Sequence, residues 1–131
     1  MRMTMHSARI LVILVGLVLP YAARVPRGLQ WLEQYTQAGL GAWLFLSAFN
    51  AIAWVALLAV SLTYQRPSSL LAPSLLGFGF LAWAHYSLDL AADAQAAIAL
   101  VFIPIYALGP LLVGAAIGFV LDRRSTAQRA A

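Results

Sequence analysis

The sequence predicts an all-α, polytopic membrane protein with four transmembrane helices. Of its 131 residues, 63% are apolar and only 9% are charged, which is too little charge to cover a water-soluble domain. Uncharged runs at 34–65, 67–88 and 94–121 each exceed the roughly 20 residues that a helix needs to cross a hydrocarbon core. A shorter apolar run precedes them. We therefore expect a single integral membrane domain, 1–131, with spans near residues 8–24, 41–64, 68–90 and 94–121.

The first apolar run, at 10–23, has two interpretations. As a helix it rises only about 21 Å, but it can cross the membrane if Arg9 and Arg24 extend their side chains to the two interfaces. A basic start and a short apolar core are also typical of a secretory signal peptide. Cleavage after Ala23 would place Tyr21 where a small residue is preferred. A retained first helix gives four spans, and a cleaved signal peptide gives three.

Residues 25–40 form the one extended polar stretch before the C-terminal tail. Leu29, Trp31, Leu32 and Tyr35 recur there at short helical spacings, with glutamines and a glutamate between them. This pattern predicts a short amphipathic helix in the membrane interface, with its aromatic rings at headgroup level. The alternative is that these residues are the frayed start of the second span.

The second and third spans, at 41–64 and 68–90, are separated by a tight turn. Ser68 or a neighbouring serine is a suitable N-cap for the third span. Trp83 and Tyr86, near the other end of that span, are typical of an aromatic belt at the membrane surface. The turn therefore lies at one interface and these aromatic residues at the other.

The fourth span, at 94–121, contains Pro104 and Pro110, and each proline removes a backbone hydrogen bond. Broken helices line the substrate sites of some transporters, but isolated proline kinks are also tolerated in membrane helices. A single helix of this kind, without a matching one elsewhere, favours a simple kink. We expect the polar residues 122–131 to form a tail.

The distribution of arginine predicts the orientation in the membrane. With four spans, six arginines lie on the side of the two termini and two lie on the other side. Positively charged loops stay in the cytoplasm, so both termini are expected there. All eight basic residues are arginine, which together with the richness in alanine and leucine suggests a GC-rich bacterial genome and hence the inner (plasma) membrane. The six are Arg2, Arg9, Arg66, Arg123, Arg124 and Arg129, and the two are Arg24 and Arg27.

The composition also argues against several functions. Without cysteine, the chain has no disulfide, thiol redox centre, thiolate metal site or palmitoyl anchor. Without lysine, it has no phosphate-binding loop of the common kind. Its arginines occur singly or in pairs, so no basic stripe could follow a nucleic-acid backbone. We expect no enzymatic activity, no cofactor and no nucleic-acid partner.

Three residues are candidates for helix packing. Gly114 and Gly118 form a GxxxG pattern that lets another helix approach closely, either within the chain or in a second copy. Gly16 has no second glycine at this spacing, so we expect it to matter less. Asn50 lies near the middle of the second span, where an amide must find a hydrogen-bond partner. It serves either as a link between helices or as a substrate ligand, and the first interpretation is favoured.

His85 and Asp89 are the candidates for chemistry, because they are four residues apart and share a helix face. Such a pair could relay protons or form half of a metal site. However, His85 lies about 9 Å from the middle of its span and Asp89 about 15 Å from it. We therefore expect a water-accessible, interfacial pair with a structural role. His6, on the opposite side, leaves no companion for a histidine metal site.

The sequence thus favours a small, non-enzymatic accessory or packing subunit of a membrane assembly. Its expected partners are the lipid bilayer and either further copies of itself or a larger membrane protein. The alternative is a small oligomeric transporter or channel that uses Asn50, His85 and the kinked fourth span.

Overall fold

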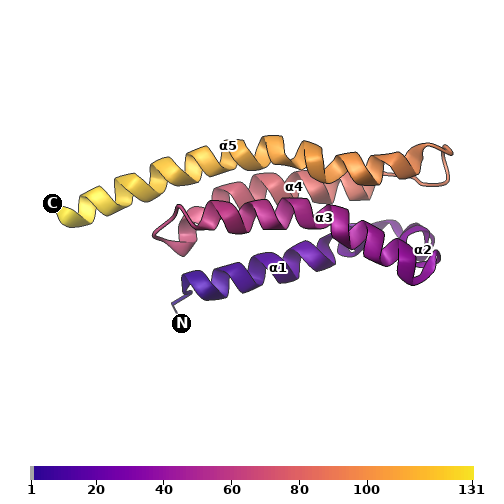
Figure 1. Ribbon diagram of the computed structural model, residues 1–131, viewed down its shortest axis with the longest axis horizontal. Coiled ribbons are helices and arrows are strands. Elements are labelled where there is room, and N and C mark those ends of the chain that lie inside the picture. Colours follow the sequence, from indigo (N-terminus) through magenta and orange to yellow (C-terminus); the bar gives the residue numbers. More distant parts are fainter. Residues whose placement is uncertain (1) are drawn as a thin grey trace.

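The computed structural model describes residues 2–131 and is a bundle of four long helices (Figure 1). All four are long and apolar enough to cross a membrane. This confirms the predicted all-α fold with four candidate spans. The N- and C-termini lie at the same end of the bundle (Figure 1). The long helices are α1 (Met5–Ala22), α3 (Gly39–Ser61), α4 (Leu71–Ser87) and α5 (Ala96–Ala130).

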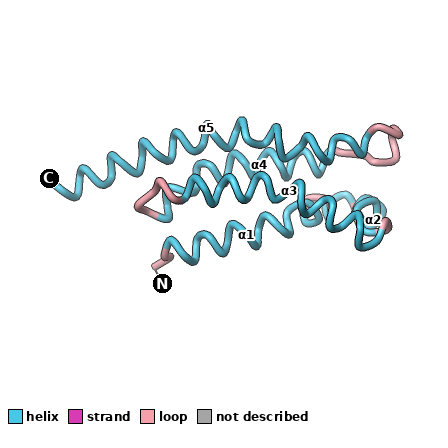
Figure 2. The backbone as a smooth tube through the Cα atoms, viewed as in Figure 1, coloured by secondary structure: helices cyan, strands magenta, loops and turns pink. Residues whose placement is uncertain are grey.

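Three short elements connect the long helices. The 3-10 turn η1 (Val25–Arg27) and helix α2 (Leu29–Thr36) lie between α1 and α3, and the 3-10 turn η2 (Pro67–Leu70) leads into α4. Figure 2 shows α2 as a separate helix at the end of the bundle away from the termini. Gly39 has a φ of 80°, a left-handed conformation that suits glycine, and the chain changes direction there. Residues 29–36 are therefore a helix of their own and not the frayed start of α3.

Helix α5 is longer than the sequence indicated. It continues to Ala130, so the residues expected to form a polar tail are helical. Pro104 and Pro110 lie inside α5 without ending it. The other α5 residues maintain the helix because α4 packs along it and because the end of the chain is rich in alanine and arginine, which favour helix. The extension beyond the bundle is visible in Figure 1.

The core lies where α3, α4 and α5 meet. Its fully buried members are Ala53, Leu57, Leu81, Ala107 and Leu111. Small residues at two of these positions let the helix backbones approach closely, as is usual where helices pack in lipid. Large apolar side chains cover the outside of all four long helices, as expected for helices that face hydrocarbon.

The two glycines of the GxxxG pattern face this chain's own α4 and η2. A Cβ atom added to Gly114 would lie 2.5 Å from the Cα atom of Pro73, and one added to Gly118 would meet the Ser69 carbonyl and the Tyr64 hydroxyl. Tyr64 donates a hydrogen bond of 2.7 Å to the Ala115 carbonyl on the same face. This face of α5 is therefore occupied within one chain, which leaves no room there for a second copy.

Helix α1 packs against α3 through a close contact at Gly16. A Cβ atom on Gly16 would lie 2.5–2.7 Å from atoms of the Trp54 side chain, so Gly16 also lies at a close helix contact. Asn50 Nδ2 donates a hydrogen bond of 2.6 Å to the Gly16 carbonyl. Gly16, which the sequence ranked below Gly114 and Gly118, therefore also lies at a close contact, although its partner is an aromatic side chain and not a second glycine.

Candidate functional site: a buried polar cluster at the end of the bundle

The most distinctive polar feature of the protein is a buried arginine where α1 ends. Arg24 has no exposed surface. Its Nε atom donates to the Trp31 carbonyl at 2.7 Å, and its Nη1 atom donates to the carbonyls of His85 and Leu88 at 2.8 and 2.7 Å. The last two carbonyls belong to the C-terminal end of α4, where a helix has no backbone donors of its own. Arg24 therefore caps α4 with a positive charge at the negative end of its dipole.

Aromatic rings surround the same guanidinium. The Cζ atom of Arg24 lies 3.9 Å from the ring centre of Tyr35 and 4.9 Å from that of Trp31. A cation over an aromatic face is stabilised by roughly 0.5–2 kcal/mol, and most strongly where water is excluded. Both rings belong to α2, so Arg24 joins α2 to the end of α4.

Arg27 and Trp31 extend this cap towards the surface. The indole Nε1 of Trp31 donates to the Tyr86 carbonyl at 3.0 Å, and Arg27 Nη1 donates to the same carbonyl at 3.2 Å. The Arg27 guanidinium also stacks over Trp31 at 4.0 Å. The carbonyls at 85, 86 and 88 of the α4 end thus all receive donors from residues 24–31.

Gln34 connects the arginine to the loop between α4 and α5. Its Oε1 atom accepts from Arg24 Nη2 at 2.7 Å and from the Leu90 backbone at 3.0 Å, and its Nε2 atom donates to Asp89 at 2.9 Å. Asp89 also accepts from the Ala91 backbone at 3.0 Å. The carboxylate of Asp89 therefore balances the arginine charge through an intervening amide.

His85 lies in the same cluster, but not with the partner or the exposure that the sequence suggested. Its side chain has no exposed surface, and its Nδ1 atom lies 2.8 Å from the Tyr35 hydroxyl. Asp89, which was expected to share its face, binds Gln34 instead, because α4 ends at Ser87 and the chain then leaves the helical path. The expected water-accessible pair of His85 and Asp89 was therefore wrong on both counts.

Tyr35 is the residue that links the histidine to the arginine. It is buried, with its hydroxyl on His85 and its ring beneath Arg24 and edge-on to Tyr21 at 6.3 Å. Burial raises the pKa of Tyr35 to about 12, although the nearby Arg24 cation lowers it. The phenol therefore stays protonated at physiological pH and can donate to His85.

The second nitrogen of the imidazole, Nε2 of His85, has no hydrogen-bond partner among residues 2–131 although it is buried. If Tyr35 donates to Nδ1, then Nε2 carries the proton; if Nδ1 donates, Nε2 is a free acceptor. In either tautomer the cluster has one polar atom that the chain itself does not satisfy. This is the group in the cluster that could still take part in proton exchange.

A buried carboxylate holds the opposite end of the bundle together. Asp122 on α5 accepts from the backbone nitrogens of Gln65 and Arg66, both at 3.1 Å, and from the Ser69 hydroxyl at 2.6 Å. It thereby fixes α5 against the turn between α3 and α4. Asp122 was assigned to the polar tail in the sequence, but it is 1% exposed.

The structure gives no sign of a metal centre in the part of the chain that it describes, residues 2–131, where no three histidine, aspartate or glutamate side chains gather.

Asn50, the remaining candidate for helix packing, lies on α3 and binds the backbone of α1. Its Nδ2 atom is bound but its Oδ1 atom is buried without a hydrogen-bond partner. The arrangement is therefore one of helix caps and interhelical links.

No protein family, curated protein or solved structure matches the chain.

Sequence reasoning missed Arg24, which it treated as an arginine that reaches out to the interface. A signal was present: an arginine directly after an apolar run, followed by a short helix with aromatic residues and a glutamine. What the sequence could not show is that the carbonyls of α4, 61 and 64 residues further along the chain, lie beside it.

Proposed function

We propose that the protein is a non-enzymatic accessory subunit of a membrane assembly in the bacterial inner membrane, with both termini in the cytoplasm. The observation that carries the proposal is the way in which the buried charged and polar groups are used. They bind the chain's own carbonyls and amides at both ends of the bundle. A protein built in this way presents a stable, lipid-compatible surface to a larger protein.

The hydrogen bonds of Arg24 show how a buried charge is used within the chain. Four of its five N–H donors bind groups of the same chain. A substrate-binding arginine would keep a pair of donors free for a carboxylate or phosphate. Arg24 is closed off by Trp31 and Tyr35, and this supports a structural role for the charge.

The shared position of the termini supports the proposed orientation. Both ends of the chain lie at one end of the bundle, and α2 lies at the other (Figure 1). Arg123, Arg124 and Arg129 all lie on the part of α5 near the C-terminus. The excess of arginine at this end favours the cytoplasmic side.

The proposal is tested by removing the gene and measuring the abundance of the other membrane proteins. We expect a specific membrane complex to lose abundance, and we expect both the wild-type gene and His85→Gln to restore it. His85→Gln keeps a side chain that can accept from Tyr35 but removes proton exchange at the imidazole. Unchanged levels of every membrane complex after deletion would contradict an accessory role.

A small transporter is the second candidate, because the unpartnered Nε2 atom of His85 is a buried, titratable group. Purified protein in proteoliposomes distinguishes the two functions. We expect no proton or cation flux above that of protein-free vesicles. A pH-dependent flux that disappears in His85→Gln would favour the transporter.

A further inference from the structure

The outer face of α5 carries a polar group at a depth where lipid offers it no partner. Tyr106 is 65% exposed, and among residues 2–131 the tyrosine hydroxyls that form hydrogen bonds are those of Tyr35 and Tyr64, so the Tyr106 hydroxyl has no partner within the chain. The apolar part of α5, 96–121, has its centre between residues 108 and 109, so Tyr106 lies about 4 Å from the middle of the span. A side chain at this depth is too far from either surface to reach water, and a phenol in hydrocarbon needs a hydrogen-bond partner.

Helix α4 supports this depth independently. It runs antiparallel to α5, with Gly77 against Leu111 and Pro73 beside Gly114. This register places Gly79, the middle of α4, level with residue 108 or 109 of α5. The centres of the two helices therefore coincide, and Tyr106 lies less than one turn from that level.

A backbone acceptor lies at the same residue. In an α-helix the carbonyl of Tyr106 would accept from the N–H of residue 110, but that residue is a proline and has no N–H. Tyr106 thus presents both a free hydroxyl donor and a carbonyl that lacks its usual helical partner. A residue that offers both a donor and an acceptor is complementary to a second copy of itself.

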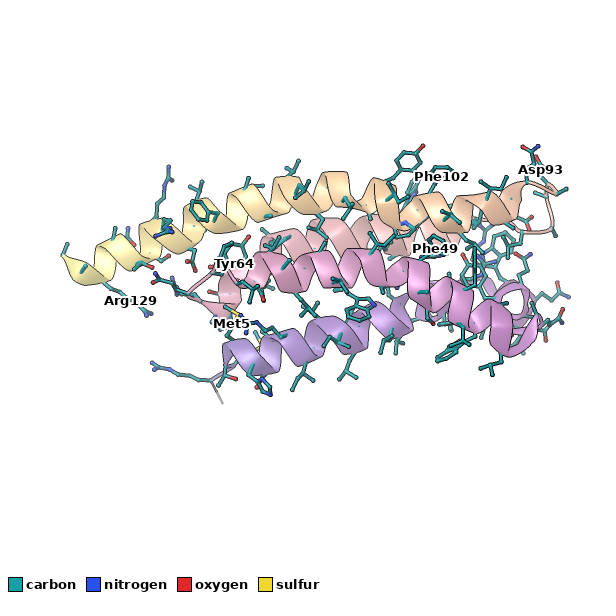
Figure 3. All side chains as sticks on the ribbon, viewed as in Figure 1. Met5, Phe49, Tyr64, Asp93, Phe102 and Arg129 are labelled. Carbon is teal, nitrogen blue, oxygen red and sulfur yellow. The ribbon has the colours of Figure 1, made fainter. Side chains whose placement is uncertain are left out.

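The shape of this face also suits a close helix contact. Gly109, one turn from Tyr106, has nothing within 4 Å of an added Cβ atom. Phe102 stacks on Tyr106 at 6.0 Å, and Figure 3 shows Phe102 on the side of α5 away from the other helices. Val113, one turn further along, is also exposed. We define the outer face of α5 as Phe102, Tyr106, Gly109 and Val113; a small residue beside a polar one is typical of helix–helix contacts in lipid.

We propose that the protein forms a homodimer through the outer face of α5, with the Tyr106 hydroxyl of each copy donating to the Tyr106 carbonyl of the other. Two copies with the same orientation in a membrane are related by a two-fold axis along the membrane normal, so their α5 helices meet in parallel and at the same depth. The GxxxG face cannot serve this purpose, because Gly114 and Gly118 are covered by α4 and η2 of the same chain.

Cysteine cross-linking tests the contact, because the chain has no cysteine of its own. Gly109→Cys places a thiol on the outer face, and Gly79→Cys places one at the same depth on α4, where an added Cβ atom also has nothing within 4 Å. After oxidation of each purified variant in phosphatidylcholine vesicles, we expect a disulfide-linked species of twice the 14.1 kDa chain for Gly109→Cys and little for Gly79→Cys. Equal yields from the two variants would overturn the proposal.

Tyr106→Phe tests the hydrogen bond without changing the shape of the face. An interhelical hydrogen bond in a bilayer changes an equilibrium about 2.8-fold on average, so losing two related by symmetry should raise the dimer dissociation constant roughly eightfold. Dilution of dye-labelled protein in the same vesicles measures this constant by energy transfer. An unchanged constant would exclude the Tyr106 contact.

Oxidation of Gly109→Cys in native membranes identifies a competing occupant. We expect the same doubled mass there. A heavier adduct with a different polypeptide, in place of the dimer, would show that this face binds a larger subunit and would refute the homodimer. Because the vesicle experiments contain no other protein, their outcome is independent of the proposed accessory function.

Discussion

The substitution Arg24→Met offers the sharpest test of the cap that joins α1, α2 and α4. It replaces a long charged side chain by a long apolar one and removes the donors to the carbonyls of Trp31, His85 and Leu88. Gln34 loses the same donor but keeps its hydrogen bond from the Leu90 backbone. The variant therefore leaves the three carbonyls without these donors and also removes the cation over the Tyr35 ring.

The expected magnitude follows from these contacts. A buried acceptor that loses its donor costs about 1–3 kcal/mol, and the cation over Tyr35 contributes roughly 0.5–2 kcal/mol. Two effects oppose this loss: the variant no longer buries a charge, and water can reach the end of the bundle once α2 loosens. We expect the free energy of unfolding to fall by about 3 kcal/mol in Arg24→Met. The free energy of unfolding of Arg24→Lys should lie between those of Arg24→Met and wild type, because an ammonium group keeps the charge without the planar arrangement of donors.

Unfolding in mixed micelles with increasing denaturing detergent, followed by circular dichroism, measures this difference. Arg27→Met is the matched control, because Arg27 is exposed and the Tyr86 carbonyl that it contacts also receives the indole of Trp31. We expect the control to lose less than about 1 kcal/mol. If the two variants were destabilised equally, Arg24 would not be the residue that holds α2 to α4, and the argument for the cap would fail.

Three further predictions concern packing, pH and topology. Gly114→Leu should destabilise the fold by more than about 2 kcal/mol in the same unfolding assay, because its side chain would meet the α4 backbone. Gly79→Leu, whose side chain would enter open space, should change the free energy of unfolding little. Equal effects of the two substitutions would contradict the packing. The pKa of Tyr35 is raised from 10.0 to about 12, so the unfolded chain loses this proton at a lower pH than the folded protein does. Tyr35 should therefore leave the free energy of unfolding unchanged below about pH 10 and lower it between about pH 10 and 12. The Tyr35→Phe variant should lack this fall. Reporter fusions at Ala131 should report the cytoplasm and fusions at Ala92 the exterior, and a periplasmic signal at Ala131 would reverse the proposed orientation.

The sequence predicted the class of the fold because the information it needed is local. A run of uncharged, apolar residues of sufficient length has few alternatives to a membrane helix, whatever its neighbours are. The short helix at 29–36 could be expected on the same grounds, from its spacing. The buried position of Asp122 near the end of α5 could not be predicted in this way. An aspartate is normally exposed, and the burial of this one depends on donors from residues 65, 66 and 69.

The cluster around Arg24 shows the limit of such reasoning. The sequence identified His85 and Asp89 but paired them with each other, since helical spacing was the one distance rule that applied to both. In the structure α4 ends between them, and each binds a residue of α2 instead, more than 45 positions earlier.

What the sequence by itself determined is therefore the all-helical membrane class of the fold, the apolar runs that become its candidate spans and the balance of charge at their ends, because hydrophobic length and arginine count act on each segment separately. The tertiary structure alone decided which buried polar atoms meet: Arg24 with the carbonyls of α4, His85 with Tyr35, and Asn50 with the Gly16 carbonyl. The physical reason is that lipid imposes one requirement on every polar group, a hydrogen-bond partner, and the identity of that partner depends on how distant segments pack.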